Sequence, residues 1–275
     1  MSGARSRRTV TSRRRNAPPR ESTRLRAVGA SGARKADRVA DDLLVRIVSG
    51  EIAVGAVLPT EDELAERYGV NRSVVREAVK LLEVHGLVRP VRRRGTLVLD
   101  PMASISPRVL RAMLTPAPGR VDRGVLNSLL EIRAVLDVEM STLAAARRTD
   151  AHLEAMELAL THMRDALGNQ AAFSAAMGEL TRAVARATGN VLFEMLATWH
   201  QSVTVDLEGI FSTTRPATEP QVQAVTLLVQ LIREKDVDSV RQLVTGFHQW
   251  ATPRLLASAA LANGDPIDTI MEKPA

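Results

Sequence analysis

Apolar residues recur every three to four positions along most of the chain between residues 122 and 261. Over residues 125–146 they recur at helical spacing, and nowhere in this part do they alternate as in a strand. Breaks rich in glycine, proline and polar residues fall near 149–150, 168–169, 189–190, 216–220 and 235–236. The pattern predicts about five main helices of about three to six turns, packed as an antiparallel bundle, with Asp122 and Asp150 capping helix N-termini.

A different pattern occupies residues 36–100. Apolar positions line one face of a helix over 36–50, which Gly50 ends. The sequence LPTEDELA then places Thr60 three residues before Glu63, and this spacing is a capping box that begins a second helix, predicted over residues 61–68.

A third helix follows after a short turn. Gly69 breaks the second helix, and Asn71 caps the next one, which is predicted to run from Arg72 to about His85 and to stop at Gly86. Two short helices joined by a glycine-containing turn are typical of a helix-turn-helix.

A basic hairpin is predicted after the third helix. Residues 87–89 are expected to form one strand, residues 91–95 a turn, and residues 96–99 the returning strand. The turn carries three arginines and a glycine, Arg92, Arg93, Arg94 and Gly95. Such a wing suits a minor groove or a run of phosphates.

The start of the third helix carries the candidate DNA-reading residues. They are Asn71, Arg72, Ser73, Val74 and Arg76. In a helix-turn-helix these N-terminal positions enter the major groove, where arginine pairs with guanine in bidentate fashion. The alternative is a solvated helix start whose arginines pair with Glu77 or Glu61. The ordered set of capping box, glycine turn, basic helix and basic wing favours DNA binding.

The same residues resemble a known family. LPTEDELA at 58–65, YGVNRSVVREA at 68–78, GLV at 86–88 and RGT at 94–96 look like the DNA-binding domain of GntR-type regulators. The resemblance implies that Arg72 and Arg76 read bases, while Ser73 and the wing around Arg92, Arg93 and Gly95 hold the backbone and the minor groove. Asp62 departs from the pattern, because a fatty-acid-responsive relative has a DNA-contacting arginine there.

The second part is similar to the C-terminal domain of the FadR subgroup of this family. The similarity rests on Glu131-Ile132-Arg133, Leu143-Ala144-Ala145, Ala187-Thr188-Gly189-Asn190 and Val240-Arg241-Gln242-Leu243-Val244. It implies an all-α bundle with a central pocket, a homodimer, and a pseudo-palindromic operator in double-stranded DNA.

Many members of this subgroup hold a divalent metal with one aspartate and three histidines. The resemblance places Met177, Thr181, Val225 and Phe247 at those positions. Because only threonine among these binds such a cation, and weakly, the pocket is expected to be apolar and to hold neither metal nor cofactor. The alternative is a different metal site assembled from His162, His200 and His248.

An apolar, metal-free pocket favours an effector with a hydrophobic part, and a fatty acid or acyl-CoA is the first expectation. Arg133 is a candidate partner for a ligand carboxylate or phosphate, with a salt bridge to Asp137, four residues on, as its alternative. Two other possibilities stay open. The effector is a small carboxylic acid metabolite, or the protein is an architectural DNA-binding protein without an effector.

The basic residues are concentrated at the start of the sequence. Residues 1–35 hold eleven basic residues and one acid, a net charge of +10 against +6 for the whole chain. Their composition predicts a disordered basic tail that binds phosphates or is a solvated leader. A linker with a short helix around 104–114 is expected over 101–121, and a loose tail over 262–275.

The remaining expectations concern class and compartment. The chain has no cysteine, which excludes disulfides and thiolate-bound metals. No nucleotide-binding glycine loop, nucleophile elbow or metal-ligand cluster is present in the sequence, so an enzyme is not expected. With no apolar run long enough to span a bilayer, the expected location is the bacterial cytoplasm, in association with the nucleoid. The expected fold is mainly α, a winged helix-turn-helix followed by the bundle.

Overall fold

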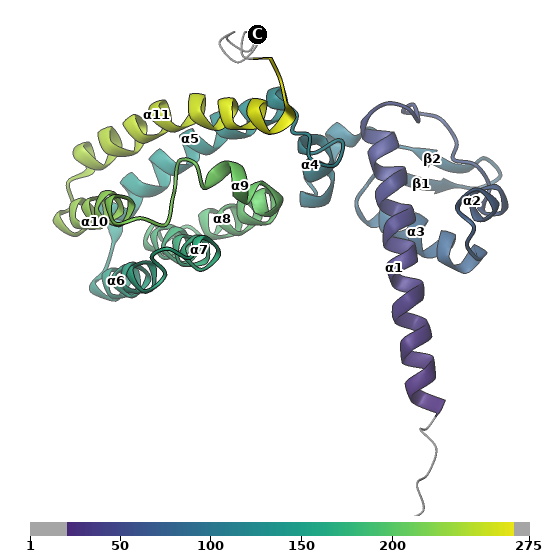
Figure 1. Ribbon diagram of the computed structural model, residues 1–275, viewed down its shortest axis with the longest axis horizontal. Helices are drawn as coiled ribbons and strands as arrows, with labels where there is room; N and C mark the ends of the chain where they lie inside the picture. The colour runs from purple at the N-terminus through teal and green to yellow at the C-terminus, as the bar shows by residue number, and fades with distance from the viewer. Residues whose placement is uncertain (1–20, 267–275) are drawn as a thin grey trace, which may run out of the picture. The chain divides into compact units, whose positions relative to one another are not determined.

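A computed structural model describes residues 21–266 of the chain, and over these residues the fold is mainly helical with one β-hairpin (Figure 1). This confirms the expected fold class. A winged helix-turn-helix precedes an all-helical part, and no helix within the described residues is long and apolar enough to cross a membrane.

The first helix is longer than the sequence pattern indicated. α1 spans Glu21–Val48, so residues 21–35 belong to a helix and not to a disordered tail. The charge pattern was misleading here, because arginine, alanine and leucine are good helix formers and the segment holds no proline after Pro19. The part of the predicted tail over 1–20 lies outside the described residues, as do residues 267–275 of the C-terminal tail.

The predicted capping box begins α2 (Glu61–Tyr68). The backbone N–H of Thr60 donates to Oε2 of Glu63 at 2.7 Å, and the backbone N–H of Glu63 donates back to Oγ1 of Thr60 at 3.3 Å. These hydrogen bonds from Thr60, the backbone one foremost, hold the pKa of Glu63 below its usual value. Gly69 ends the helix in the left-handed region at φ +61°, and α3 follows over Arg72–Val84. Local sequence therefore fixes the helix-turn-helix.

The wing is a two-stranded antiparallel sheet of β1 (Val88–Val91) and β2 (Gly95–Val98). Its register pairs Val88 with Val98 and Val91 with Gly95. At Gly95 the backbone has φ +92°, and a Cβ there would lie 2.8 Å from Cγ1 of Val57. Only glycine fits this position, which gives it a structural reason independent of any contact with DNA.

The helical part contains six long helices between residues 122 and 261, where about five were predicted. After a 3-10 turn (Pro101–Ala103) come α4 (Pro107–Leu114), α5 (Arg123–Arg147), α6 (Asp150–Asp165), α7 (Gln170–Ala187), α8 (Val191–Thr204), a 3-10 turn (Val205–Leu207), α9 (Glu208–Phe211), α10 (Glu219–Glu234) and α11 (Val237–Asn263). Each predicted break coincides with a helix boundary. α5 and α11 have 25 and 27 residues and so exceed the predicted lengths.

One of the two predicted N-caps is correct. The Asp122 side chain accepts a hydrogen bond from the N–H of Val125 at 2.9 Å and caps α5. For α6 the cap is Thr149 and not Asp150, since Oγ1 of Thr149 accepts from the N–H of His152. Asp150 instead pairs with Arg148 at 3.2 Å from the first turn of the helix.

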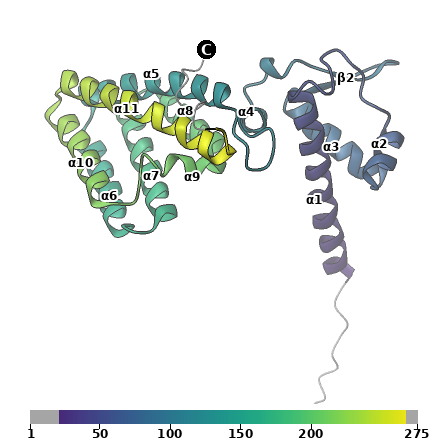
Figure 2. The same cartoon turned by 45° about the horizontal axis from the view of Figure 1, so that its top comes forward.

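The bundle has two sides. α5 and α11 run side by side, and α6, α7 and α8 pack in succession opposite them (Figures 1 and 2). One buried cluster joins the C-terminal half of α5 to α6, α7 and α10, with Met156, Met163 and Phe173 fully buried in it. A second joins α4 and the first half of α5 to α8, α9 and α11. The core is thus apolar at both ends of the bundle.

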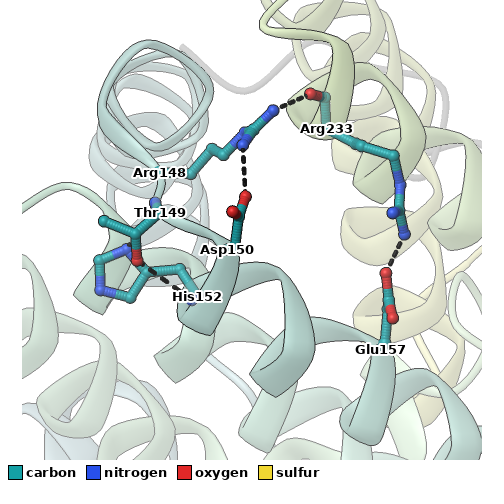
Figure 3. A network of polar contacts seen from close by, with 6 residues as sticks. All are labelled: Arg148, Thr149, Asp150, His152, Glu157 and Arg233. Atoms are coloured by element: carbon teal, nitrogen blue, oxygen red, sulfur yellow. Dashed lines mark hydrogen bonds and ion pairs between the residues drawn. The ribbon is translucent and has the colours of Figure 1, made fainter.

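A polar network secures α10 against α6 (Figure 3). Arg148, in the α5–α6 turn, donates to the backbone carbonyl of Arg233 near the end of α10, and the Arg233 guanidinium pairs with Glu157 of α6. The Arg148 side chain is only 17% exposed, so these bonds are partly shielded from water. The network satisfies a carbonyl that the end of α10 leaves without a helical partner.

Candidate DNA-reading surface and effector cavity

The N-terminal turn of α3 presents four of the five predicted reading residues to solvent. Asn71, Arg72, Ser73 and Arg76 are exposed. Val74 is only 9% exposed and lies on the buried face of the helix, so it offers little surface for a base contact. The reason is helical spacing, which puts position 74 on the inward stripe with the other buried residues Val75, Ala78 and Leu82.

Both arginines of this surface pair with carboxylates of α2. Arg72 forms an ion pair with Asp62, and Nε of Arg76 lies 2.6 Å from Oε2 of Glu61. The pairing with Glu61 is the one that the sequence offered as an alternative to base contact. The guanidinium side chains remain 66% and 62% exposed, so the pairs leave both arginines accessible.

The wing tip exposes its three arginines. The backbone N–H of Arg94 donates to the carbonyl of Val91 at 3.0 Å and closes the turn. Arg93 adopts φ +63°, in the left-handed region that non-glycine residues rarely occupy. A non-glycine residue in such a strained conformation is a candidate for function.

We expect Arg93→Gly to raise the free energy of unfolding by up to about 1 kcal/mol, because glycine adopts a left-handed conformation without strain. The same change should weaken DNA binding roughly tenfold and reduce its salt slope by about one, because one phosphate contact is lost. Urea unfolding and fluorescence anisotropy measure the two effects. Arg92→Gly is the control, since Arg92 has an ordinary φ and its replacement should lower stability. Equal stability changes in the two variants would contradict the strain argument.

The bundle contains a cavity of about 490 Å³, partly open to solvent, between α5, α7, α8 and α9. Arg133, Met177 and Thr181 from the predicted pocket line it. A second cavity, of about 140 Å³, lies between α5, α7, α10 and α11 and is lined by Met177, Thr181, Val225 and Phe247. All five predicted residues therefore line one cavity or both.

The two cavities adjoin each other. They share five lining residues, Asp137, Met140, Met177, Thr181 and Arg215. We call them the head cavity, the larger one, and the tail cavity, the smaller one. The tail cavity is mainly apolar, whereas the shared wall contains both an acid and a base.

The shared wall departs from the expected apolar lining, because it carries charged groups besides Arg133. Nε of Arg133 lies 3.3 Å from Oδ2 of Asp137, the alternative pairing foreseen from the sequence, and Nε2 of His248 lies 3.1 Å from the same oxygen. Burial would raise the pKa of Asp137, but the charge of Arg133, the hydrogen bond from His248 and the charge of Arg215 hold it well below its usual range. Asp137 is therefore an anion at neutral pH.

Arg215 is the cation that sequence reasoning missed. Its guanidinium lies 5.2 Å from the ring centroid of Phe247, and no carboxylate among the described residues lies within ion-pair distance of it. Burial and the nearby Arg133 lower its pKa to about 9. No periodicity marks this position, since Arg215 lies in the loop between α9 and α10.

His200 is a second polar group without a partner. Its Nε2 atom is buried and has no hydrogen bond, although the residue lines the head cavity. Burial and the charge of Arg133 lower its pKa to about 3, so the ring is neutral at physiological pH. The head cavity thus offers two guanidinium groups and a neutral imidazole to a ligand.

The three histidines considered as a metal site are not brought together. His162 pairs with Glu179 at 2.7 Å on the surface, His200 lines the head cavity, and His248 contacts Asp137. Within residues 21–266 no group of three or more His, Cys, Asp and Glu side chains is arranged to hold a metal ion.

Several known proteins are similar to this chain. The uncharacterized HTH-type transcriptional regulator Rv0494 of Mycobacterium tuberculosis is 34% identical over 59% of this chain and 65% of its own length. The HTH-type transcriptional regulator LutR of Bacillus subtilis is 35% identical over 42% of this chain and 51% of its own length. The chain therefore spans less than two thirds of the length of both relatives. The galactonate operon transcriptional repressor of Escherichia coli is 27% identical over 80% of this chain and 96% of its own length.

Solved structures and family comparisons agree with the architecture. The structure of Lar, described as controlling the expression of the Listeria monocytogenes agr system, has a TM-score of 0.55 at 18% identity, and the match covers 80% of this chain and 95% of that one. This shows a shared fold. Residues 35–98 match the bacterial regulatory proteins of the gntR family, and residues 128–247 match the FCD domain. The two matches, in this order along one sequence, identify a gntR-type DNA-binding domain followed by an FCD domain.

Proposed function

We propose that the protein is a transcriptional repressor of the FadR subgroup whose affinity for operator DNA is controlled by a carboxylic acid bound in its helical part. The single observation that carries the ligand proposal is Arg215, a partly buried guanidinium on the wall of two adjoining cavities, with no carboxylate of the described residues within ion-pair distance. A cation shielded from water gains from a close anionic partner, and a ligand carboxylate would supply one.

The DNA-binding half of the proposal rests on exposed cations. Asn71, Arg72 and Arg76, which are exposed, would meet base edges in the major groove, and Ser73 would contact the DNA backbone beside them. The wing residues Arg92, Arg93 and Arg94, with Gly95 forming their turn, would follow the phosphates or the minor groove. Such a protein would act on the nucleoid in the bacterial cytoplasm.

A homodimer is part of the proposal. α8 exposes Val191, Leu192 and Met195 at 68%, 58% and 61%, and large apolar side chains clustered on one exposed helix favour association with a second protein surface. A two-fold dimer would match a pseudo-palindromic operator. Size-exclusion chromatography with light scattering tests this, and a monomer at micromolar concentration would contradict it.

The two cavities suggest the shape of the ligand. The carboxylate would meet Arg133, Arg215 and His200 in the head cavity, and a hydrocarbon part would enter the tail cavity beside Val225 and Phe247. A free fatty acid or another amphipathic acid fits this division better than acyl-CoA, whose nucleotide adds several phosphates to a site with two arginines. The similar repressor of the galactonate operon is named for a carboxylic acid too, though a fully polar one.

The site is proposed to work without a metal. Met177, Val225 and Phe247 have no oxygen or nitrogen side-chain donor, and Thr181 directs its hydroxyl to the backbone carbonyl of Met177 at 3.0 Å. Arg215 would take over the anchoring of the carboxylate. His200, on α8, lines the head cavity next to Trp199, whose indole N–H donates to the carbonyl of Ile105 at 2.9 Å in the segment that follows the wing. α8 therefore gives a ligand in the cavity a route to that segment.

The test uses selected DNA and a panel of acids. A duplex is selected from a random library with the full-length protein, and its affinity is measured by fluorescence anisotropy at fixed salt. Butyrate, octanoate, palmitate, galactonate and palmitoyl-CoA are then compared for thermal stabilisation and for release of the duplex. We expect octanoate or palmitate to act at micromolar concentration. Specific DNA binding without a response to any acid would contradict the carboxylate proposal, and palmitoyl-CoA acting alone would replace it.

A further inference from the structure

The two arginines of the DNA-reading surface are held by carboxylates of the preceding helix. Asp62 pairs with Arg72, and Glu61 pairs with Arg76 at 2.6 Å. The carboxylates are neighbours in the first turn of α2, and the arginines lie four residues apart on α3, hence on one face of that helix. The four side chains are between 42% and 66% exposed, so the pairs lie at the surface that would meet DNA.

The atoms that form these pairs leave the terminal Nη groups of both arginines available to a base. In both cases the contact is made by Nε, on the side of the guanidinium. The two terminal Nη groups are the ones that match O6 and N7 of guanine, since two parallel N–H bonds are needed there. A carboxylate at Nε therefore limits the rotation of a guanidinium without occupying the edge that reads a base.

We propose that Asp62 and Glu61 are positioning residues that determine base specificity by orienting Arg72 and Arg76. The inference rests on the proposed DNA-binding function. A long, free arginine binds any phosphate within reach, which strengthens binding to every sequence alike. A carboxylate beside the arginine holds its guanidinium in one orientation and repels phosphates. The resulting loss of DNA affinity is greatest on DNA that lacks the matching guanine.

The neighbouring acids of α2 provide a comparison. Glu63 is engaged in the capping box with Thr60. Glu66 is exposed and forms no ion pair among the described residues. Glu66→Gln therefore removes one negative charge from the same helix without releasing an arginine of α3, which makes it the matched control for Asp62→Asn and Glu61→Gln.

The experiment compares these three variants with the unmodified full-length chain. The duplex selected by the unmodified protein and a shuffled duplex of equal composition are titrated by anisotropy at several salt concentrations. For Asp62→Asn we expect the ratio of the two affinities to fall about five- to tenfold, mainly through tighter binding to the shuffled duplex, with a salt slope on that duplex steeper by about one. Glu61→Gln should act in the same direction, and Glu66→Gln should leave the ratio within about twofold.

A repeat of the selection with Asp62→Asn adds an independent readout. The variant should lose its preference at the base pair read by Arg72 and keep it elsewhere. Thermal unfolding of all variants should agree within a few degrees, because exposed ion pairs add little to stability. Equal changes on both duplexes, or equal effects of Asp62→Asn and Glu66→Gln, would overturn the proposal and leave a plain charge effect. If the unmodified protein selects no sequence, the proposed function itself fails.

Discussion

Asp137→Ala is expected to lower the free energy of unfolding by up to about 3 kcal/mol, because it breaks from one side an ion pair whose side chains are only 11% and 22% exposed. The Asp137 carboxylate lies at 3.3 Å from Arg133 and 3.1 Å from His248, and its charge also offsets that of Arg215. Its removal leaves two cations facing one another across a cavity wall. The measurement is urea unfolding of the protein without ligand, and the melting temperature should fall by roughly 10 °C.

The difference in unfolding free energy between the unmodified protein and Asp137→Ala should depend on pH in a definite direction. The pKa of Asp137 is lower in the folded chain than its ordinary value of 3.8, so its stabilisation is fully present above that value. It is lost as the pH falls toward the lower folded pKa and the carboxylate takes up a proton. The stability gap between the unmodified protein and Asp137→Ala should therefore be constant near neutrality and should shrink in strong acid.

Glu139→Ala is the matched control on the same helix. Glu139 also pairs with an arginine, since its Oε1 lies 2.7 Å from Arg241, but both side chains of that pair are 48% exposed. Water screens such pairs, and the control should cost less than about 1 kcal/mol. If the two variants lost equal stability, the wall of the cavity would not be the low-dielectric site inferred here. Added octanoate should stabilise Asp137→Ala more than it stabilises the unmodified protein, because the octanoate carboxylate takes the place of the missing Asp137 carboxylate.

The DNA-reading part could be predicted closely because its signals are local. A capping box, a glycine at a left-handed position and a closing hairpin turn each depend on residues within a few positions, and Thr60, Glu63, Gly69 and Gly95 all lie where the sequence placed them. Val74 is the least exposed of the five candidate reading residues, a difference that a list of adjacent residues misses because it ignores helical periodicity. Its burial follows once positions 74, 75, 78 and 82 are seen as one stripe.

The cavity could be predicted only in part, for a reason of distance along the chain. Arg133 and Asp137 are four residues apart, so their pairing was visible in the sequence. His248 and Arg215 reach the same wall from α11 and from a loop, and only the folded bundle brings these separate segments together. The pattern at Met177, Thr181, Val225 and Phe247 predicted an apolar lining without the charged groups beside it.

Arg215→Met is expected to weaken binding of the strongest acid of the panel at least about 100-fold, because the ligand carboxylate would lose its charge-assisted partner. The same change should leave the stability of the ligand-free protein nearly unchanged, since methionine removes a partly buried cation that faces the like charge of Arg133. Isothermal calorimetry and thermal unfolding measure the two effects. DNA affinity without ligand should be unchanged, so the variant would be a repressor that no longer responds.

Arg164→Met is the control that distinguishes the specific effect of Arg215→Met on ligand affinity from a general loss of positive charge. Arg164 is exposed on α6 and lines neither cavity, so its removal should change ligand affinity less than twofold. Loss of ligand affinity together with loss of stability in Arg215→Met would mean that Arg215 supports the fold, and the carboxylate anchor would then have to be sought at Arg133.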